Sequence, residues 1–256
     1  MPFYTDPAQM MDEVKPEAVI IATPNDLHLG VAREAVKRNI VPLVEKPISN
    51  DLEDRQAFAR RGRDAGVPVL VGQHRRHNPF VNKAKEIIEA GELGKLTVSS
   101  FHYMIYKNDE YFDVEWRRKK GAGPILVNLV HDVDLLRYLL GEPVAVQGMQ
   151  SSAARGFETE DSAVVNVRFA DGALASMTIS DATASPWNWE ATAREDPQYR
   201  PFDADAYFIG GTLGALRCPA CTSSPTTEPP TGTSRCRWRF RPSTRRCRTR
   251  CSSSTL

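Results

Sequence analysis

The stretch from residue 18 to residue 47 reads AVIIATPNDLHLGVAREAVKRNIVPLVEKP and has the pattern of a parallel sheet. Two short apolar runs, at 18–23 and 41–44, each stop at a polar turn that contains a proline. Continuous apolar runs of this length are typical of strands buried on both faces. Residues 28–38 lie between them and space their apolar side chains along one face of a helix. Together they predict a strand–helix–strand unit with parallel strands and a right-handed crossover.

The same alternation continues further along the chain. Asp51 is placed to cap a helix over 52–65, because its carboxylate accepts hydrogen bonds from free backbone N–H groups. Gly66 is placed to end that helix, and a third apolar run follows at 67–72. We therefore expect residues 1–73 to form part of a doubly wound α/β domain.

The segment from 74 to 216 has a different pattern, in which long strands alternate apolar and polar residues. An aspartate–glycine pair at 171–172, between two such strands, signals a hairpin. The pattern predicts helices at 79–90 and 125–140, and strands at 96–106, 144–150, 162–169 and 173–180. We expect an α+β domain with a largely antiparallel sheet and helices on one face.

Charge and cysteine content divide the chain near residue 217. Residues 217–256 hold nine arginines, one acidic residue and all five cysteines, so their net charge is +8 against −7 for the rest. Their composition indicates disorder, and a shifted reading frame would explain the change. Two alternatives stay open: a zinc site that begins with the Cys218–Cys221 spacing, and nucleic-acid binding by the arginine-rich stretch. We expect neither a metal nor a nucleic-acid partner.

Composition also excludes several classes of protein. No apolar run reaches the roughly 18 residues of a membrane-spanning helix, so we expect no membrane partner. The first residues lack the basic and apolar regions of a secretory signal, which predicts a cytoplasmic protein. No cysteine precedes Cys218, so nothing before it indicates a disulfide framework or a thiolate metal site.

Polar residues follow the first two predicted strands. They are Thr23, Pro24 and Asn25 after the first strand, and Glu45, Lys46 and Pro47 after the second. Ligands of open α/β sheets bind beyond the carboxyl ends of the strands, where both loops lie. A lysine such as Lys46 can there polarise a substrate oxygen or bind an anion. The alternative is a loop lysine in open solvent.

A histidine stands in the apolar helix predicted at 125–140. His131 is suited to proton transfer near neutral pH, and Asn128, three residues earlier, shares its helix face. The alternative is a core histidine that a backbone carbonyl satisfies. We expect Asp134 to cap or pair locally and Asp132 to face water.

Five motifs, in this order and spacing, resemble the Gfo/Idh/MocA family of nicotinamide-dependent oxidoreductases. They are ATPNDLH at 22–28, VEKPI at 44–48, GQHRRHNP at 72–79, EWR at 115–117, and GAGP at 121–124 leading to HDVDLL at 131–136. The likeness runs from about residue 4 to residue 216. No single motif suffices, and their common register makes the likeness specific.

The resemblance implies a Rossmann domain at 1–73, a substrate-binding and oligomerisation domain at 74–216, and an aberrant tail at 217–256. It implies hydride transfer between NAD or NADP and a hydroxyl carbon of a sugar, inositol or related polyol, in a homo-oligomer. Lys46 and His131 are then catalytic, with Asn128 beside them. The cofactor-binding residues implied are Thr23, Pro24, Asn25, His28, Glu45, Lys46, Pro47, Trp116 and Arg117.

The chain departs from the family in two places. Members often carry an aspartate four residues before the histidine, where this chain has Val127. The neighbouring Asn128 can orient a hydroxyl but cannot relay a proton. No Gly-x-Gly-x-x-Gly turn precedes residue 18, so we expect impaired NAD(P) binding. A non-catalytic relative that binds a sugar-like ligand or a protein partner is the alternative.

Overall fold

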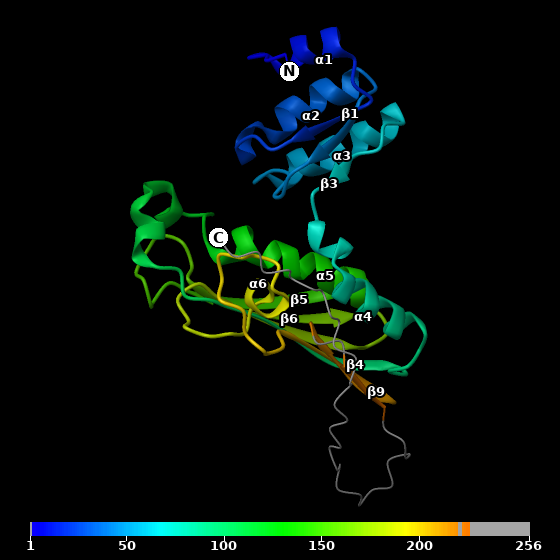
Figure 1. Ribbon diagram of the computed structural model, residues 1–256, viewed down its shortest axis with the longest axis vertical. Helices are drawn as coiled ribbons and strands as arrows, with labels where there is room; N and C mark the ends of the chain where they lie inside the picture. Colours follow the sequence, from blue (N-terminus) through cyan, green and yellow to red (C-terminus); the bar gives the residue numbers. More distant parts are fainter. Residues whose placement is uncertain (1, 220–221, 226–256) are drawn as a thin grey trace, which may run out of the picture. The chain divides into compact units, whose positions relative to one another are not determined.

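Three parallel strands form the first sheet, in agreement with the apolar runs. The computed structural model describes residues 2–219 and 222–225 (Figure 1). All of them belong to the same unit of the chain. The strands, in sheet order, are β1 (Ala18–Ile21), β2 (Val41–Val44) and β3 (Leu70–Val71). The helices among them are α1 (Pro7–Val14), α2 (His28–Lys37) and α3 (Leu52–Ala65), with a short turn η1 (Asn25–Leu27).

Both predicted ends of α3 are present. The Asp51 side chain accepts a hydrogen bond from the backbone N–H of Asp54 at 2.7 Å. Gly66 ends the helix with a φ of 66°, in the left-handed region that glycine enters without strain. These local signals therefore fixed the helix bounds correctly.

The expectation that β1 is buried on both faces is wrong. Val19 and Ile21 are buried, whereas Ile20 between them is 77% exposed. The apolar side chains of α2 and α3, such as Leu29 and Phe58, form one core cluster with Val19 and Ile21. Within the described part of the chain, side chains thus pack against one face of β1, and a continuous apolar run cannot reveal that asymmetry.

The second sheet has seven strands in the order β10-β9-β8-β4-β7-β6-β5. They are β4 (Leu96–Met104), β5 (Pro143–Ser151), β6 (Ser162–Phe169), β7 (Leu174–Ser180), β8 (Tyr207–Gly211), β9 (Gly214–Cys218) and β10 (Thr222–Pro225). β4 and β7 run parallel, and all other neighbouring pairs run antiparallel. The predicted hairpin joins β6 to β7, with Gly172 at a φ of 89°. The largely antiparallel second sheet is therefore confirmed.

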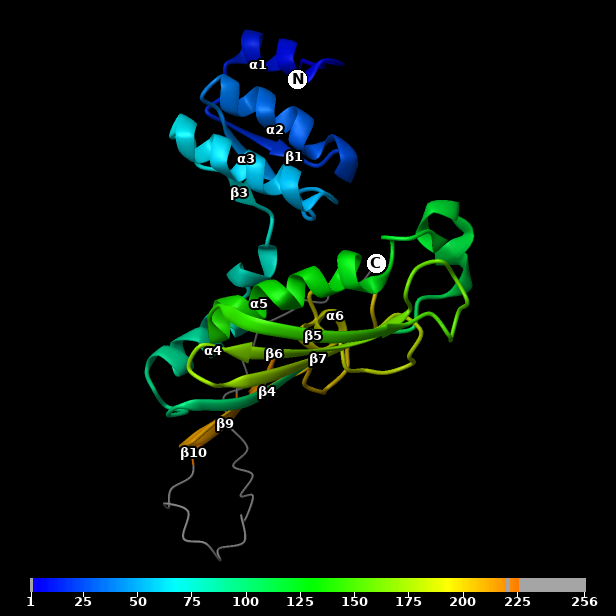
Figure 2. The same ribbon diagram turned by 180° about the vertical axis from the view of Figure 1, so that it is seen from behind.

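Two helices cover one face of this sheet. α4 (Pro79–Glu89) and α5 (Val130–Leu140) lie along it in both views (Figures 1 and 2). Leu135 and Leu136 of α5 form a single core with Phe101 of β4 and Met177 of β7. The remaining helices are α6 (Trp189–Ala193) and the short turns η2 (His74–His77), η3 (Asp109–Asp113) and η4 (Glu115–Arg118).

The helix predicted at 125–140 begins with a wider turn. Residues Ile125–Leu129 form a π-helical turn, η5, and α5 follows it directly. Glu160 Oε1 accepts a hydrogen bond from the backbone N–H of Ile125 at 3.0 Å, which satisfies a free donor at this end. Single π turns inside helices are frequent at functional sites, and this one carries Asn128.

Regular structure extends beyond residue 216. β9 ends at Cys218 and β10 occupies Thr222–Pro225, so the first part of the segment expected to be aberrant joins the sheet. The arginine-rich stretch and the cysteines at 221, 236, 247 and 251 lie outside the described residues. Among the described residues, no three His, Cys, Asp or Glu side chains gather as a metal site. No helix in that part of the chain is long and apolar enough to cross a membrane.

Candidate active site

The two polar loops lie at the same edge of the first sheet. Ile21 of β1 pairs with Val44 of β2 in a parallel register, so the loops that follow both strands start side by side. His28 links these loops. Its Nε2 lies 2.7 Å from the carbonyl oxygen of Thr23, and its Nδ1 lies 3.0 Å from that of Pro47.

His28 is buried, with 1% of its surface exposed, and both of its ring nitrogens face these carbonyl oxygens. A neutral imidazole has a single N–H and donates to one of them. Neither nitrogen is left to reach a bound molecule. His28 therefore holds the two loops together. A direct contact between His28 and the cofactor stays a prediction.

Lys46 reaches the helix that carries His131. Its Nζ lies 3.4 Å from the carbonyl oxygen of Val127, one turn before His131. Burial lowers the pKa of Lys46; Glu45 and Glu190 oppose this shift, and Arg75 adds to it. The interpretation as a loop lysine in open solvent does not fit this half-buried position.

His131 is a buried neutral imidazole. Its surface is 6% exposed, and its pKa is lowered to about 2, first by burial and then by the positive charges of Arg75, Lys46 and His74. The ring of His74 lies edge-on at 5.2 Å. Among the described residues, His131 Nδ1 has no hydrogen-bond partner. The alternative interpretation requires a backbone carbonyl that satisfies the imidazole. Nδ1 has no such partner among the described residues.

Asn128 is held at both ends of its amide. Its Oδ1 accepts a hydrogen bond from Lys107 Nζ at 2.9 Å, and its Nδ2 donates to the hydroxyl of Tyr103 at 2.8 Å. Lys107 is buried, and its ammonium also lies 3.9 Å from Asp181 Oδ2 and 4.6 Å from the centre of the Tyr111 ring. The sequence gives no signal for a role of Lys107 in the site, because no motif surrounds it.

The expectation that Asp132 faces water is wrong. Asp132 is 1% exposed, and its Oδ1 accepts hydrogen bonds from the Tyr207 hydroxyl and, at 3.4 Å, from Arg75 Nη1. Burial raises its pKa to about 6 against the opposing effect of Arg75. The next acidic residue, Asp134, pairs with Arg76 through two hydrogen bonds of 2.7 and 2.6 Å.

Arg75 is the charged centre beneath the site. Its guanidinium is 3% exposed and binds Glu190 at 2.6 Å, besides Asp132, with Glu195 at 3.8 Å. It lowers the pKa of both Lys46 and His131. The only sequence signal for Arg75 was its place within the GQHRRHNP motif, which assigned it no role.

Trp116 and Arg117 lie in η4. Trp116 is 54% exposed. The guanidinium of Arg117 lies 4.1 Å from the centre of the Tyr111 ring, and its Nη1 donates to the Tyr111 carbonyl at 2.8 Å. Because Tyr111 also meets Lys107, the structure joins Arg117 to the side of the site that holds Asn128. Its cofactor contact stays a prediction.

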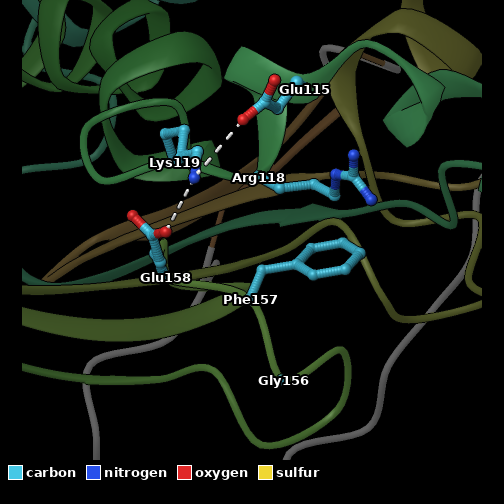
Figure 3. A pocket seen from close by; sticks show the side chains of 6 residues that line it. All are labelled: Glu115, Arg118, Lys119, Gly156, Phe157 and Glu158. Atoms are coloured by element: carbon cyan, nitrogen blue, oxygen red, sulfur yellow. Dashed lines mark hydrogen bonds and ion pairs between the residues drawn. The ribbon is translucent and has the colours of Figure 1, made fainter.

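A separate hollow of about 290 Å³ opens beyond η4. It is lined by Glu115, Arg118, Lys119, Gly156, Phe157 and Glu158 (Figure 3). Lys119 pairs with Glu158 at 3.0 Å and with Glu115 at 3.6 Å across it. Lys119, Glu115 and Glu158 thus pair among themselves, and none of the predicted site residues lines the hollow.

The class of protein is that of the oxidoreductases with an NAD-binding Rossmann fold, and the parallel first sheet and helix-covered second sheet agree with it. Residues 1–73 match the family model described as oxidoreductase family, NAD-binding Rossmann fold. Residues 81–217 match the GFO/IDH/MocA C-terminal domain. The chain belongs to the Gfo/Idh/MocA family, so the resemblance in its motifs is confirmed.

Characterised relatives are similar over part of their length. The scyllo-inositol 2-dehydrogenase (NAD(+)) of Bacillus subtilis is 29% identical over 193 residues, which cover 73% of this chain and 55% of that protein. The myo-inositol 2-dehydrogenase of Thermotoga maritima is 28% identical, with 67% and 52% covered. The WlbA dehydrogenase of Bordetella pertussis, solved with NADH and UDP-GlcNAcA, superposes with a TM-score of 0.69 at 25% identity, with 84% and 58% covered. The chain spans about half the length of these relatives.

Proposed function

We propose that this protein is an NAD(P)-dependent oxidoreductase that transfers a hydride between the nicotinamide and a hydroxyl carbon of a sugar, inositol or related polyol. The contact between Lys46 Nζ and the Val127 carbonyl carries the proposal, because it joins the strand-end loop to the helix of His131. The names of the inositol dehydrogenases and the match to an NAD-binding domain support the substrate class and the cofactor.

The loops after β1 and β2 fit a dinucleotide. Thr23 Oγ1 is buried and has no hydrogen-bond partner among the described residues, so it is available to a bound molecule at the edge where such sheets bind nucleotides. The residues proposed to hold the cofactor are Thr23, Pro24, Asn25, Glu45, Lys46 and Pro47, with Trp116 and Arg117 from η4 and His28 behind them. A nicotinamide cofactor held by these residues would supply the hydride chemistry.

Lys46 and His131 are proposed to have different roles at the same substrate hydroxyl. The Lys46 ammonium donates a hydrogen bond to the reacting oxygen and stabilises the negative charge that develops there. His131 is proposed to take the hydroxyl proton as a general base, because its Nδ1 has no hydrogen-bond partner among the described residues. The charge of Arg75 favours the neutral imidazole of His131 and opposes the charged form of Lys46.

Asn128 is proposed to act as a positioning residue. Both ends of its amide are already bonded, to Lys107 and to Tyr103. It therefore fixes the Lys107 ammonium beside the turn that Lys46 contacts. At position 127 Lys46 meets a backbone carbonyl, since Val127 has no polar side chain.

The open face of the second sheet supports the expected homo-oligomer. Large apolar side chains on it are at least 40% exposed: Val98, Met149, Val164, Leu174 and Phe208. Apolar surface gathered in this way marks contact sites, and we propose a second copy of the chain as its partner. Light scattering after gel filtration tests it, with a monomeric mass as the contradicting result.

A dehydrogenase assay tests the proposed function. The protein is mixed with NAD⁺ or NADP⁺ and a panel of inositols and sugars, and NADH or NADPH absorbance is followed. We expect reduction with at least one polyol, and loss of that signal in Lys46→Met. Calorimetric binding of a polyol without any reduction would instead favour the non-catalytic relative.

A further inference from the structure

The groups whose electrostatic effect shifts the pKa of His131 are all basic. No carboxylate is among them. The charged groups that act on its ring are Arg75, Lys46 and His74, and all three push its pKa in the same direction. Three carboxylates of this region, those of Asp132, Glu190 and Asp181, are already bound to arginines. Arg75 binds Asp132 and Glu190, and Arg155 binds Asp181 at 3.2 Å.

Two ammonium groups reach the same turn of η5. Lys46 Nζ meets the carbonyl of Val127, and Lys107 Nζ meets the side-chain oxygen of Asn128, the next residue. Both hydrogen-bond acceptors are neutral. Lys107 forms an ion pair with Asp181 at 3.9 Å, which is longer than a hydrogen bond, and Asp181 also pairs with Arg155 at 3.2 Å. A buried ammonium whose carboxylate is distant and shared is costly, so a further anion would stabilise it.

Arg117 is a further cation in contact with the Tyr111 ring. Both groups lie against the Tyr111 ring, at 4.1 Å for the guanidinium carbon of Arg117 and 4.6 Å for Lys107 Nζ. Arg117 Nη1 is fixed by the Tyr111 carbonyl, while its Nε is buried and has no hydrogen-bond partner among the described residues. A carboxylate is the group that the free edge of a guanidinium binds best.

We propose that the substrate of this site carries a carboxylate, bound by Lys107 and Arg117 while Lys46 holds the reacting hydroxyl. Within the proposed class of sugars and polyols, the preferred substrate is then a sugar acid, such as a uronate or an aldonate. This inference rests on the proposed function, since it places the reacting hydroxyl at Lys46 and His131. It gives Lys107, which the motifs left without a role, a contact with substrate.

Binding of matched acid and neutral sugars tests the inference. Calorimetry at one fixed ionic strength compares glucuronate with glucose, galacturonate with galactose, and gluconate with glucitol. We expect at least one acid to bind about tenfold more tightly than its neutral partner, as one charge-assisted contact allows. The preference should disappear in Lys107→Gln and weaken in Arg117→Gln.

Two further variants complete the test. Arg118→Gln changes the next residue, an exposed arginine of the separate hollow, and should keep the preference. Lys107→Arg retains the charge and should keep part of the preference. If Lys107→Gln does not fold, by circular dichroism, Arg117→Gln carries the test alone. Equal affinities within all three pairs would overturn the inference, as would a preference unchanged in Lys107→Gln and Arg117→Gln.

The outcome separates this inference from the proposed function. Reduction of NAD⁺ by neutral polyols without any preference for acids overturns the carboxylate and leaves the dehydrogenase in place. Selective, Lys107-dependent binding of an acid without hydride transfer supports the carboxylate and contradicts the dehydrogenase.

Discussion

The ammonium nitrogen of Lys46 lies 3.4 Å from the carbonyl oxygen of Val127, although 81 positions separate the two residues in the chain. Val127 precedes His131 by four residues, which is about one turn of a helix. The charge of Lys46 in turn lowers the pKa of His131. A loop of the first sheet and a helix of the second thus act on each other electrostatically at this point.

Replacement of Lys46 by methionine should lower kcat by about 10²–10³-fold, because the ammonium is proposed to stabilise charge that develops during the reaction. Substrate affinity should change much less, since the side chain acts mainly on the reacting oxygen. Lys37→Met is the matched control, as Lys37 is an exposed lysine that pairs with Glu34 on α2. Steady-state kinetics give the kcat of Lys46→Met and of Lys37→Met. Similar kcat values in these two variants would remove Lys46 from the mechanism.

Local signals in the sequence predicted most of the fold. The caps of α3 depend on Asp51 and Gly66, which bond backbone groups within one helical turn. Both caps are present in the structure. The hairpin at Gly172 depends on three consecutive residues and is likewise present. The loops at Thr23 and Glu45 start side by side because parallel neighbouring strands end at the same edge.

Contacts between distant residues could not be predicted in the same way. The periodicity of α5 does not reveal that Asp132 meets Arg75 and Tyr207, which lie 57 and 75 positions away. Lys107 follows a correctly predicted strand, but its contact with Asn128 depends on how η5 packs against that strand. The catalytic and cofactor-binding roles of the candidate residues remain predictions.

Replacement of Arg75 by methionine should destabilise the fold by about 3–5 kcal/mol, because it leaves Asp132 and Glu190 buried without their cation. Urea unfolding followed by circular dichroism measures the loss. Arg137→Met is the control, since Arg137 pairs with Glu142 at the surface and its loss should leave the unfolding midpoint nearly unchanged. Similar losses in both variants would show that the buried network contributes little.

Two glycine substitutions should change stability in opposite directions. An alanine side chain meets nothing within 4 Å at either Gly30 or Gly66, so only the backbone decides. Gly66 has a φ of 66°, and Gly66→Ala should cost about 1 kcal/mol. Gly30 lies within α2, and Gly30→Ala should stabilise by about 0.5–1 kcal/mol. Thermal unfolding of the two variants measures both effects, and shifts of the same sign would contradict the expectation.

His131 should make the fold less stable as the pH falls below about 6.5. Its pKa is lowered from 6.5 to about 2, so in this range the unfolded chain binds a proton that the folded protein does not. Stability therefore decreases from about pH 7 to pH 5, by up to about 2 kcal/mol for this single group.

Comparison with His131→Gln isolates that contribution. Asp132 acts in the opposite sense, because its pKa is raised to about 6 and the folded protein binds the extra proton below that pH. Asp132 is present in both proteins, so its effect largely cancels in the difference between their urea unfolding free energies. We expect the wild type to lose stability relative to the variant as the pH falls. A difference that stays constant between about pH 7 and pH 5 would mean that His131 takes up a proton in the folded state as readily as in the unfolded chain, and that burial and the neighbouring cations do not lower its pKa.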